Sequence, residues 1–393
     1  MSSPQRPARI YLVTAEPSGD ALAGDLIDAL RRQSPDVEIK GVGGTEMAAR
    51  GVPSLYDTSE LSVFGFFDGA RIAKLAHQRA QEAADDAAQF GADAVVAIDS
   101  YGFMLRLAWK LKDTLPDVPR VKYVGPQVFA SRRGRAKVIA ENFDHLLAIH
   151  LFDAPYYEPY GLPVTFVGNP ALARDLSGDG PGFRARHGLD PDKPVLLVLF
   201  GSRQSELDRL FAHFADTVRR LRMDYPDLQT ATVLSATIAD AARAKIAGEP
   251  VFADMVVADA EERRDGFHAA DLALACSGTV TTELARVGVP TVAAYRLGWI
   301  LWAAARLFLM KSKYISLTNI AADDMLIPEF VQTRCTGAHL SRALSSMLGD
   351  PQRRAALSEQ LKDVTLRMAG SADPSEEAAR AILDIARKKA DAE

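Results

Sequence analysis

Several side chains that could take part in catalysis directly follow apolar runs of the sequence. Asp99 comes after the run 94–98, and Glu16 follows closely on the run 10–13. A carboxylate at the carboxyl end of a buried strand can act as a general base, although an Asp that caps the next helix is at least as common. Asp99 and Glu16 are therefore candidate catalytic carboxylates.

The stretch Thr-Ala-Glu-Pro-Ser-Gly-Asp, residues 14–20, turns an apolar run into a Pro-Gly turn where a helix should begin. Ser18 or Asp20 can cap a helix that starts at Ala21, and Ser18 can equally contact a substrate. Gly19 would let the backbone turn close to that substrate.

One further turn is suited to binding phosphate. Cys276-Ser-Gly-Thr279 joins an apolar run to a helical pattern, so open backbone amides and a helix N-terminus can hold an anion around Gly278. Ser277 and Thr279 add hydroxyl donors, and Glu283 could accept both hydroxyls of a ribose. The alternative is an N-cap with Glu283 as its capping-box partner.

Arginines supply positive charge at two other turns. Arg203, in the loop after the run 194–200, could neutralise a departing diphosphate, whereas the plainer interpretation is a surface ion pair with Glu206. Arg132 and Arg135 follow a Gly-Pro turn and suit an anionic or phosphorylated acceptor. A solvated helix start is the alternative there.

The elements that must position these residues alternate between apolar runs and amphipathic stretches, which predicts parallel sheets. The pattern indicates an α/β chain of two Rossmann-like, doubly wound domains that face a cleft. A Gly- and Pro-rich segment between the two series of strands, 175–183, reads as a linker. We expect an N-terminal domain over 1–180, a second domain over 181–365, and a C-terminal helix over 366–393 that can pack back on the first domain.

Composition excludes several classes of protein. The 393 residues are 48% hydrophobic and 25% charged, as in globular proteins, and a net charge of −5 argues against binding nucleic acid by bulk electrostatics. The sequence holds no P-loop, no zinc-protease motif and no nucleophile elbow, and Gly41-Val-Gly-Gly44 fails the dinucleotide pattern. We expect no metal and no other cofactor. Two cysteines and no signal-peptide core predict a cytoplasmic protein.

The segment 298–313 is apolar with basic ends, and Arg306 interrupts it. Trp299, Trp302 and Phe308 make it resemble a helix that lies in a membrane interface. A buried core helix explains the same pattern, so a membrane contact remains one of two interpretations.

Ordered motifs along nearly the whole chain resemble those of the lipid-A-disaccharide synthase family. They are Glu16-Pro-Ser-Gly-Asp20, Glu60-Leu-Ser-Val-Phe-Gly65, Tyr123-Val-x-Pro126, Arg132-x-Gly-Arg135, Val164-Thr-Phe-Val-Gly168, Gly201-Ser-Arg-x-Ser-Glu206, Ser277-Gly-Thr-x-Thr-x-Glu283 and Tyr314-x-Ser-Leu-x-Asn319.

The resemblance implies an inverting GT-B glycosyltransferase, peripheral at the cytoplasmic face of the bacterial inner membrane and either monomeric or a homodimer. Such enzymes join UDP-2,3-diacylglucosamine to 2,3-diacylglucosamine 1-phosphate and release UDP. Asp99 and Glu16 would then work near the acceptor, with Asp99 as the base. The resemblance assigns the UDP portion to Arg203, Ser277, Thr279, Glu283 and Asn319.

Departures from the family pattern gather in the first domain. Ala15 replaces a glycine, Ser100-Tyr-Gly-Phe-Met104 replaces Ala-Pro-Asp-Phe-Asn, and Gln127-Val-Phe-Ala-Ser131 replaces a tryptophan-containing stretch. Asn169 replaces a histidine of the family pattern, and Phe200 replaces a proline. The alternatives are a related transferase with another lipid acceptor and a catalytically silent, membrane-associated binding protein.

Overall fold

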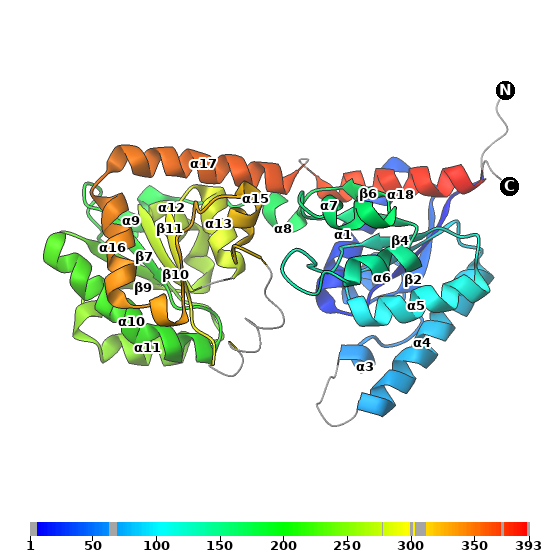
Figure 1. The fold of residues 1–393 in the computed structure, drawn as a ribbon, viewed down its shortest axis with the longest axis horizontal. Helices are drawn as coiled ribbons and strands as arrows, with labels where there is room; N and C mark the ends of the chain where they lie inside the picture. The colour runs from blue at the N-terminus through cyan, green and yellow to red at the C-terminus, as the bar shows by residue number, and fades with distance from the viewer. Residues whose placement is uncertain are drawn as a thin grey trace. The chain divides into compact units, whose positions relative to one another are not determined.

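The computed structural model describes residues 6–62, 69–276, 278–298, 302, 312–370 and 373–390. It divides into two compact units, which we call unit 1 (Met1–Ala173 with Ala369–Glu393) and unit 2 (Arg174–Met368). Each unit holds one six-stranded parallel sheet flanked by helices, which confirms the predicted α/β class (Figure 1).

The strands of unit 1 follow the order β2-β1-β3-β4-β5-β6. Their bounds are β1 (Arg9–Val13), β2 (Glu38–Val42), β3 (Ala94–Ile98), β4 (Arg120–Tyr123), β5 (His145–Ala148) and β6 (Val164–Phe166). The chain moves from β1 to β2 and then crosses back to β3 on the other side of β1. The switch point of this sheet therefore lies between β1 and β3.

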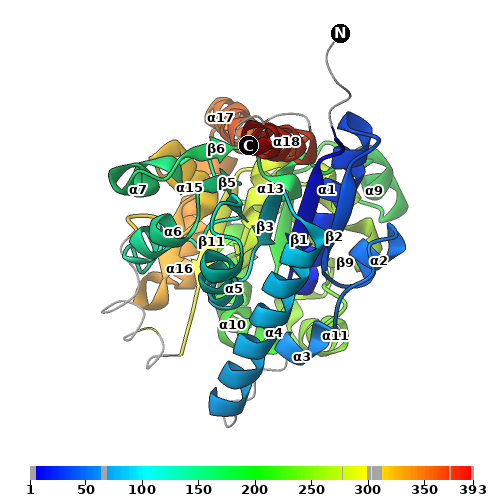
Figure 2. The same ribbon diagram turned by 90° about the vertical axis from the view of Figure 1, so that its right-hand side faces the viewer.

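Both faces of this sheet are covered by helices, so alternate side chains of one strand enter two different cores. Tyr11 and Val13 pack with residues of α4 (Gly69–Phe90) and α5 (Tyr101–Thr114). Ile10 and Leu12 pack instead with α1 (Pro17–Gln33) and α18 (Pro374–Ala390), on the opposite side (Figure 2). Burial on both faces explains why the strands read as continuous apolar runs.

The first helix begins earlier than predicted: α1 starts at Pro17, whereas the sequence indicates Ala21. Proline suits this position because the first amides of a helix have no intrahelical acceptor. Asp20 consequently lies inside α1 and caps a different helix, α2 (Thr45–Ala49). Its carboxylate accepts hydrogen bonds of 2.7 and 2.8 Å from the backbone amides of Gly44 and Glu46.

The remaining elements of unit 1 are short. They are α3 (Ser59–Ser62), α6 (Arg135–Asn142), α7 (Ala154–Tyr157), the 3-10 helix η1 (Glu158–Tyr160) and α8 (Pro170–Ala173). Asn169 precedes α8, and its side-chain oxygen accepts a 3.0 Å hydrogen bond from the amide of Ala171. An asparagine thus caps this turn where the family pattern has a histidine.

Unit 2 has the strand order β12-β11-β10-β7-β8-β9. The bounds are β7 (Val195–Leu199), β8 (Gln229–Val233), β9 (Val256–Ala258), β10 (Leu272–Cys276), β11 (Thr291–Tyr295) and β12 (Glu329–Val331). The switch point lies between β7 and β10. The edge strand β12 was not predicted, because it is short and half-buried and its Glu329 interrupts any apolar run.

Helices cover both faces of this second sheet as well. They are α9 (Gly180–Arg186), α10 (Gln204–Asp224), α11 (Ala239–Ala247), α12 (Arg263–Ala269), α13 (Thr279–Val287), α15 (Leu317–Ala322), α16 (Gly337–Leu348) and α17 (Pro351–Ala369), with the 3-10 helices η2 (Pro250–Phe252), η3 (Ala260–Glu262) and η5 (Gln332–Arg334). Phe200, which stands where the family has a proline, fills the core beside Phe211, Phe214 and Phe252.

The C-terminal helix α18 belongs to unit 1 and packs on α1 (Figure 1). Ile382 and Leu383 enter the same core as Ile27 of α1. At the edge of this contact the side-chain amide of Gln33 donates a 2.8 Å hydrogen bond to the backbone carbonyl of Glu376. The last helix therefore covers one face of the sheet whose switch point is described below.

We expect Ile382→Ala to lower the free energy of unfolding of unit 1 by about 2–5 kcal/mol, because it deletes a fully buried side chain and leaves a cavity. Asp384→Ala, at an exposed position of the same helix, should change that free energy by less than about 0.5 kcal/mol. Urea unfolding followed by circular dichroism measures both. Equal effects of the two substitutions would contradict the packing.

Candidate functional site

The first candidate site lies at the switch point of unit 1. β1 and β3 are adjacent parallel strands, and their connections leave in opposite directions. Ligands of doubly wound sheets bind beyond the carboxyl ends of such a pair. Asp99 follows β3, and Ser18 lies in the first turn of α1 after β1. Ser18 Oγ donates a 2.9 Å hydrogen bond to Asp99 Oδ2, so the structure brings these two predicted residues together.

The backbone at Asp99 is in an uncommon conformation. Asp99 and Ser100 have φ angles of 55° and 29°, in the left-handed region that favours glycine. Each such residue costs about 1–3 kcal/mol, and the surrounding structure must hold it in place. The amide of Asp99 donates a 2.9 Å hydrogen bond to the carbonyl of Tyr123 on β4, which is part of that support.

Lys122 is a residue of this site that sequence reasoning did not select. It lies on β4 with only 1% of its surface exposed. Its ammonium group donates to the carbonyls of Ala97 and Tyr123, each at 3.3 Å, and to the carbonyl of Asp99. Burial lowers the pKa of Lys122 to about 7, while the charges of Asp99 and Glu16 act in the opposite direction.

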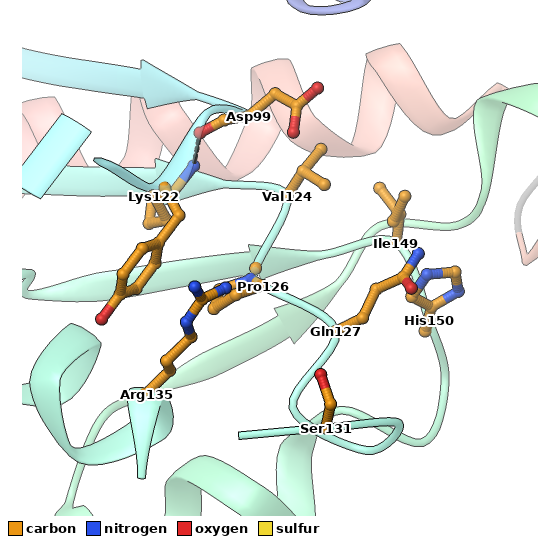
Figure 3. Close-up of a pocket in the computed structure, with 11 residues that line it drawn as sticks. Asp99, Lys122, Val124, Pro126, Gln127, Ser131, Arg135, Ile149 and His150 are labelled. Atoms are coloured by element: carbon orange, nitrogen blue, oxygen red, sulfur yellow. Dashed lines mark hydrogen bonds between the residues drawn. The ribbon is translucent and has the colours of Figure 1, made fainter. Parts of the chain in front are cut away.

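These groups border a cavity of about 380 Å³. Figure 3 shows Lys122 beneath Asp99, with Gln127, Ser131 and Arg135 on the opposite wall. The guanidinium of Arg135 lies 4.3 Å from the ring centroid of Tyr101, which holds this cation at the wall. The cavity thus combines a carboxylate, a hydroxyl and a cation, the groups that a polar and anionic ligand requires.

His150 also lines this cavity. It is buried, and burial lowers the pKa of its imidazole to about 4. The ring is therefore neutral at physiological pH and stacks on Phe152 at a centroid distance of 5.2 Å. It adds a polar edge to the cavity without adding charge.

Two other predicted residues of unit 1 lie outside the cavity wall. Glu16 is the exposed N-cap residue of α1, and its negative charge raises the pKa of Lys122. Arg132 is exposed, with a left-handed φ of 50°. Of the two predicted acceptor-side arginines, the structure places Arg135 at the cavity.

The second candidate site lies at the switch point of unit 2, beyond the adjacent parallel strands β7 and β10. A cavity of about 390 Å³ opens there, lined by Arg203, Arg263, Gly278 and Thr279. The turn around Gly278 and the loop of Arg203, both expected from the sequence to suit an anion, therefore reach one cavity. Ser277 lies outside the described residues.

Arg203 makes the ion pair that the plainer interpretation predicted. Its guanidinium lies 3.0 Å from Glu206, yet the side chain is 77% exposed, so this pair contributes little to stability. The other oxygen of Glu206 accepts hydrogen bonds of 3.0 and 3.2 Å from the amides of Ser202 and Arg203. Glu206 closes the loop and leaves the Arg203 guanidinium at the mouth of the cavity.

Arg263 is a second cation at this cavity, and the sequence did not single it out because it lies in a run of charged residues. It pairs with Glu283 on α13 and lies over the ring of Phe267. Glu283, predicted to accept ribose hydroxyls, is thus held beside the cavity by Arg263. Two guanidinium groups at one cavity suit an anionic ligand such as a diphosphate.

Asn319 occupies a different position from the other residues predicted for the UDP portion. It is fully buried in α15. Its side-chain amide forms hydrogen bonds with both the carbonyl and the backbone amide of Ile327. It donates to the carbonyl at 2.7 Å and accepts from the amide at 2.9 Å. In the described structure Asn319 fixes the loop between α15 and β12 and does not line the cavity of unit 2.

The predicted membrane-contact segment falls almost entirely outside the described residues, including Trp299 and Phe308. Trp302 is described, and its amide donates a 2.8 Å hydrogen bond to the carbonyl of Gly298. Among the helices that the structure describes, none is both long and apolar enough to cross a bilayer.

Comparison with known proteins decides the family. The family model for lipid-A-disaccharide synthetase matches residues 10–383. The chain belongs to this family. A lipid-A-disaccharide synthase of Rhodospirillum centenum is 39% identical over 98% of this chain and 96% of its own length. Another, from Paramagnetospirillum magneticum, is 36% identical over 96% of this chain and 98% of its own length.

Solved structures support the GT-B fold of this family member. The crystal structure of MurG from Acinetobacter baumannii matches with a TM-score of 0.62 and 16% identity, over 96% of this chain and 100% of that chain. The UDP-GlcNAc 2-epimerase of Neisseria meningitidis bound to UDP-GlcNAc matches with a TM-score of 0.55 and 10% identity, over 98% and 100% of the two chains. At these identities the likeness concerns the fold alone.

The buried Lys122 makes the stability of unit 1 depend on pH. Between pH 7 and the ordinary lysine pKa of about 10.4, the unfolded chain binds a proton at this residue that the folded chain does not. The free energy of unfolding should therefore rise with pH over this window, by at most about 1.4 kcal/mol per pH unit, relative to Lys122→Met. Urea titrations at several pH values test this. Parallel pH curves for the two proteins would contradict it.

Proposed function

We propose that this chain is an inverting hexosyltransferase that joins UDP-2,3-diacylglucosamine to 2,3-diacylglucosamine 1-phosphate, giving the lipid A disaccharide 1-phosphate and UDP. Membership of the family and the names of relatives that match nearly end to end support this reaction. The observation in the structure that carries the proposal is Asp99, a carboxylate at a switch point beside a polar cavity. A catalytically silent binding protein would have no use for such a group.

Unit 2 would bind the donor. The cavity between the ends of β7 and β10 offers two arginines, and Thr279 begins α13 directly after Gly278. Gly278 has a φ of 146°, a conformation that a side chain would strain, so glycine suits the approach of the chain to a phosphate. Arg203 and Arg263 would neutralise the diphosphate, and Glu283 would contact the ribose.

Unit 1 would bind the acceptor. Arg135 stands at the wall of its cavity, where it can pair with the phosphate at C1 of the acceptor sugar. Ser18 would contact the sugar while it orients the Asp99 carboxylate. The exposed Glu16 and Arg132 would complete the set of polar groups proposed for the acceptor.

The reaction follows from these groups. Asp99 takes the proton of the attacking acceptor hydroxyl as its oxygen forms a bond to the anomeric carbon of the donor. The bond from that carbon to the diphosphate oxygen breaks, and UDP leaves with the electron pair. Arg203 and Arg263 stabilise the charge that develops on the diphosphate. One displacement without a covalent enzyme intermediate inverts the anomeric centre.

A related transferase with a different lipid acceptor is the second candidate function. Tyr101, Gln127 and Ser131 line the unit 1 cavity, and all three belong to stretches in which this chain departs from the family pattern. The departures therefore lie where the acceptor would bind. The unit 2 motifs follow the family closely, so both candidates share a UDP-sugar donor.

Acylated substrates reside in a membrane, so we propose that the protein works as a peripheral protein at the cytoplasmic face of the inner membrane. The tryptophan-containing segment 298–313 would contribute the contact through Trp299, Trp302 and Phe308. Vesicle binding would measure this association.

The proposed reaction predicts that purified protein releases UDP and forms a disaccharide from the two diacylglucosamine substrates. Mass spectrometry of the lipid product together with enzymatic detection of UDP measures this. UDP release only with another lipid acceptor would favour the second candidate. No transfer with any acylated amino-sugar acceptor would contradict both.

Asp99→Asn should lower kcat by about 10²–10⁴-fold, because the amide cannot take the proton of the acceptor hydroxyl. Asp113→Asn, at an exposed position near the end of α5, is the control and should keep wild-type kcat. Steady-state kinetics of UDP release, with circular dichroism to verify folding, provide the measurement. An Asp99→Asn enzyme with wild-type kcat would rule out Asp99 as the base.

A further inference from the structure

Lys122 has no role in the reaction described above, yet it lies directly beneath the residue assigned as the base. Its ammonium group donates to three backbone carbonyls, those of Ala97, Asp99 and Tyr123. An ammonium has three N–H donors, so this set uses all of them. Lys122 therefore has no donor left for a substrate, and any effect on catalysis must pass through its neighbours.

The three carbonyls belong to two strand ends that form the floor of the cavity. Ala97 and Asp99 lie at the end of β3, and Tyr123 ends β4. Ammonium contacts to both ends hold them together at the point where Asp99 and Ser100 adopt left-handed conformations. Lys122 is thus part of the structure that keeps the Asp99 side chain facing the cavity (Figure 3).

The charges around this ammonium are mainly negative. Asp99 at the end of β3 and Glu16 before α1 both favour its protonated form, against the effect of burial. The other titratable or charged groups that line the cavity are Tyr101 on α5, Arg135 on α6 and His150 after β5. His150 is neutral, and Arg135 lies against the Tyr101 ring.

We propose that Lys122 is a positioning residue for Asp99: its ammonium joins the ends of β3 and β4 and so fixes the backbone that carries the base. This inference rests on the proposed function, in which Asp99 takes the proton of the acceptor. Burying an ammonium opposes folding, and an apolar side chain of similar length would avoid that cost. The three hydrogen bonds to carbonyls at the strand ends explain why an ammonium is present.

The kinetic test compares wild type with Lys122→Met, Lys122→Arg and Lys40→Met in the two-substrate assay below pH 7, where Lys122 is protonated. Lys40 is the matched control, because it lies in the same sheet and pairs with Asp86 at 2.6 Å, away from the cavity. Lys122→Met should lower kcat by about tenfold to a hundredfold with KM within about twofold, because the base is displaced while the acceptor site remains.

Rescue by arginine, together with the split between kcat and KM, separates positioning from simple structural support. Lys122→Arg keeps a cation with several N–H donors, so it should restore kcat at least in part, and Lys40→Met should match wild type. A Lys122→Met enzyme with wild-type kcat overturns the proposal.

A second measurement needs neither activity nor a folded Lys122→Met variant. NMR of protein labelled at the lysine side chains should show one ammonium with a midpoint near pH 7, far below the ordinary value for lysine. Asp99→Asn should move this midpoint to lower pH, because interacting groups titrate together. An unchanged midpoint overturns the proposal.

The two readouts also separate this inference from the proposed function. If Asp99→Asn retains full activity but lowers the lysine midpoint, the two groups are coupled and the assignment of the base fails. That result overturns the catalytic part of this inference as well. If Asp99→Asn is inactive while Lys122→Met keeps wild-type kinetics, the proposed function stands and Lys122 has no positioning role.

Discussion

Parallel pairing of β1 with β3, and of β7 with β10, is the constraint on which both candidate sites depend. In each unit the chain leaves these two adjacent strands toward opposite edges of the sheet, so the connections diverge beyond their carboxyl ends. Polar residues that follow the strands then face a space that no crossover fills. Helices on both faces of each sheet make the strands themselves apolar, which leaves their ends as the place for chemistry.

The unit 1 site shows how a sheet can hold a reactive carboxylate. Ser18 donates to the Asp99 carboxylate from one side, and Lys122 binds the Asp99 carbonyl from below. The backbone amide of Asp99 also donates a hydrogen bond to the carbonyl of Tyr123. Together these contacts support a backbone conformation that would otherwise be unfavourable. Contacts from α1 and β4 thus hold both the side chain and the backbone of Asp99.

The unit 2 cavity differs in that it has cations at an exposed surface. Arg203 and Arg263 each pair with a glutamate and remain near the cavity, so their charge is held in place without being buried. Such exposed pairs add little to stability, and their value lies in the placement of the guanidinium groups. In the proposed function, the exposed arginines of unit 2 would meet the diphosphate, and the site above the buried Lys122 would meet the acceptor hydroxyl.

The sequence by itself determined the alternation of strands and helices, the two sheets, and the turns that carry Asp99, Ser18, Arg203 and Thr279, because apolar periodicity and turn residues are local signals. Tertiary structure alone decided which of these turns meet. It also decided that Asp20 caps α2 and that Asn319 forms hydrogen bonds with Ile327. Likewise, only the tertiary structure pairs Arg263 with Glu283 and places Lys122 under Asp99. Each of these contacts joins residues from different elements, and strand order and helix packing set their distance. The distance between two residues of different elements cannot be inferred from a local sequence pattern.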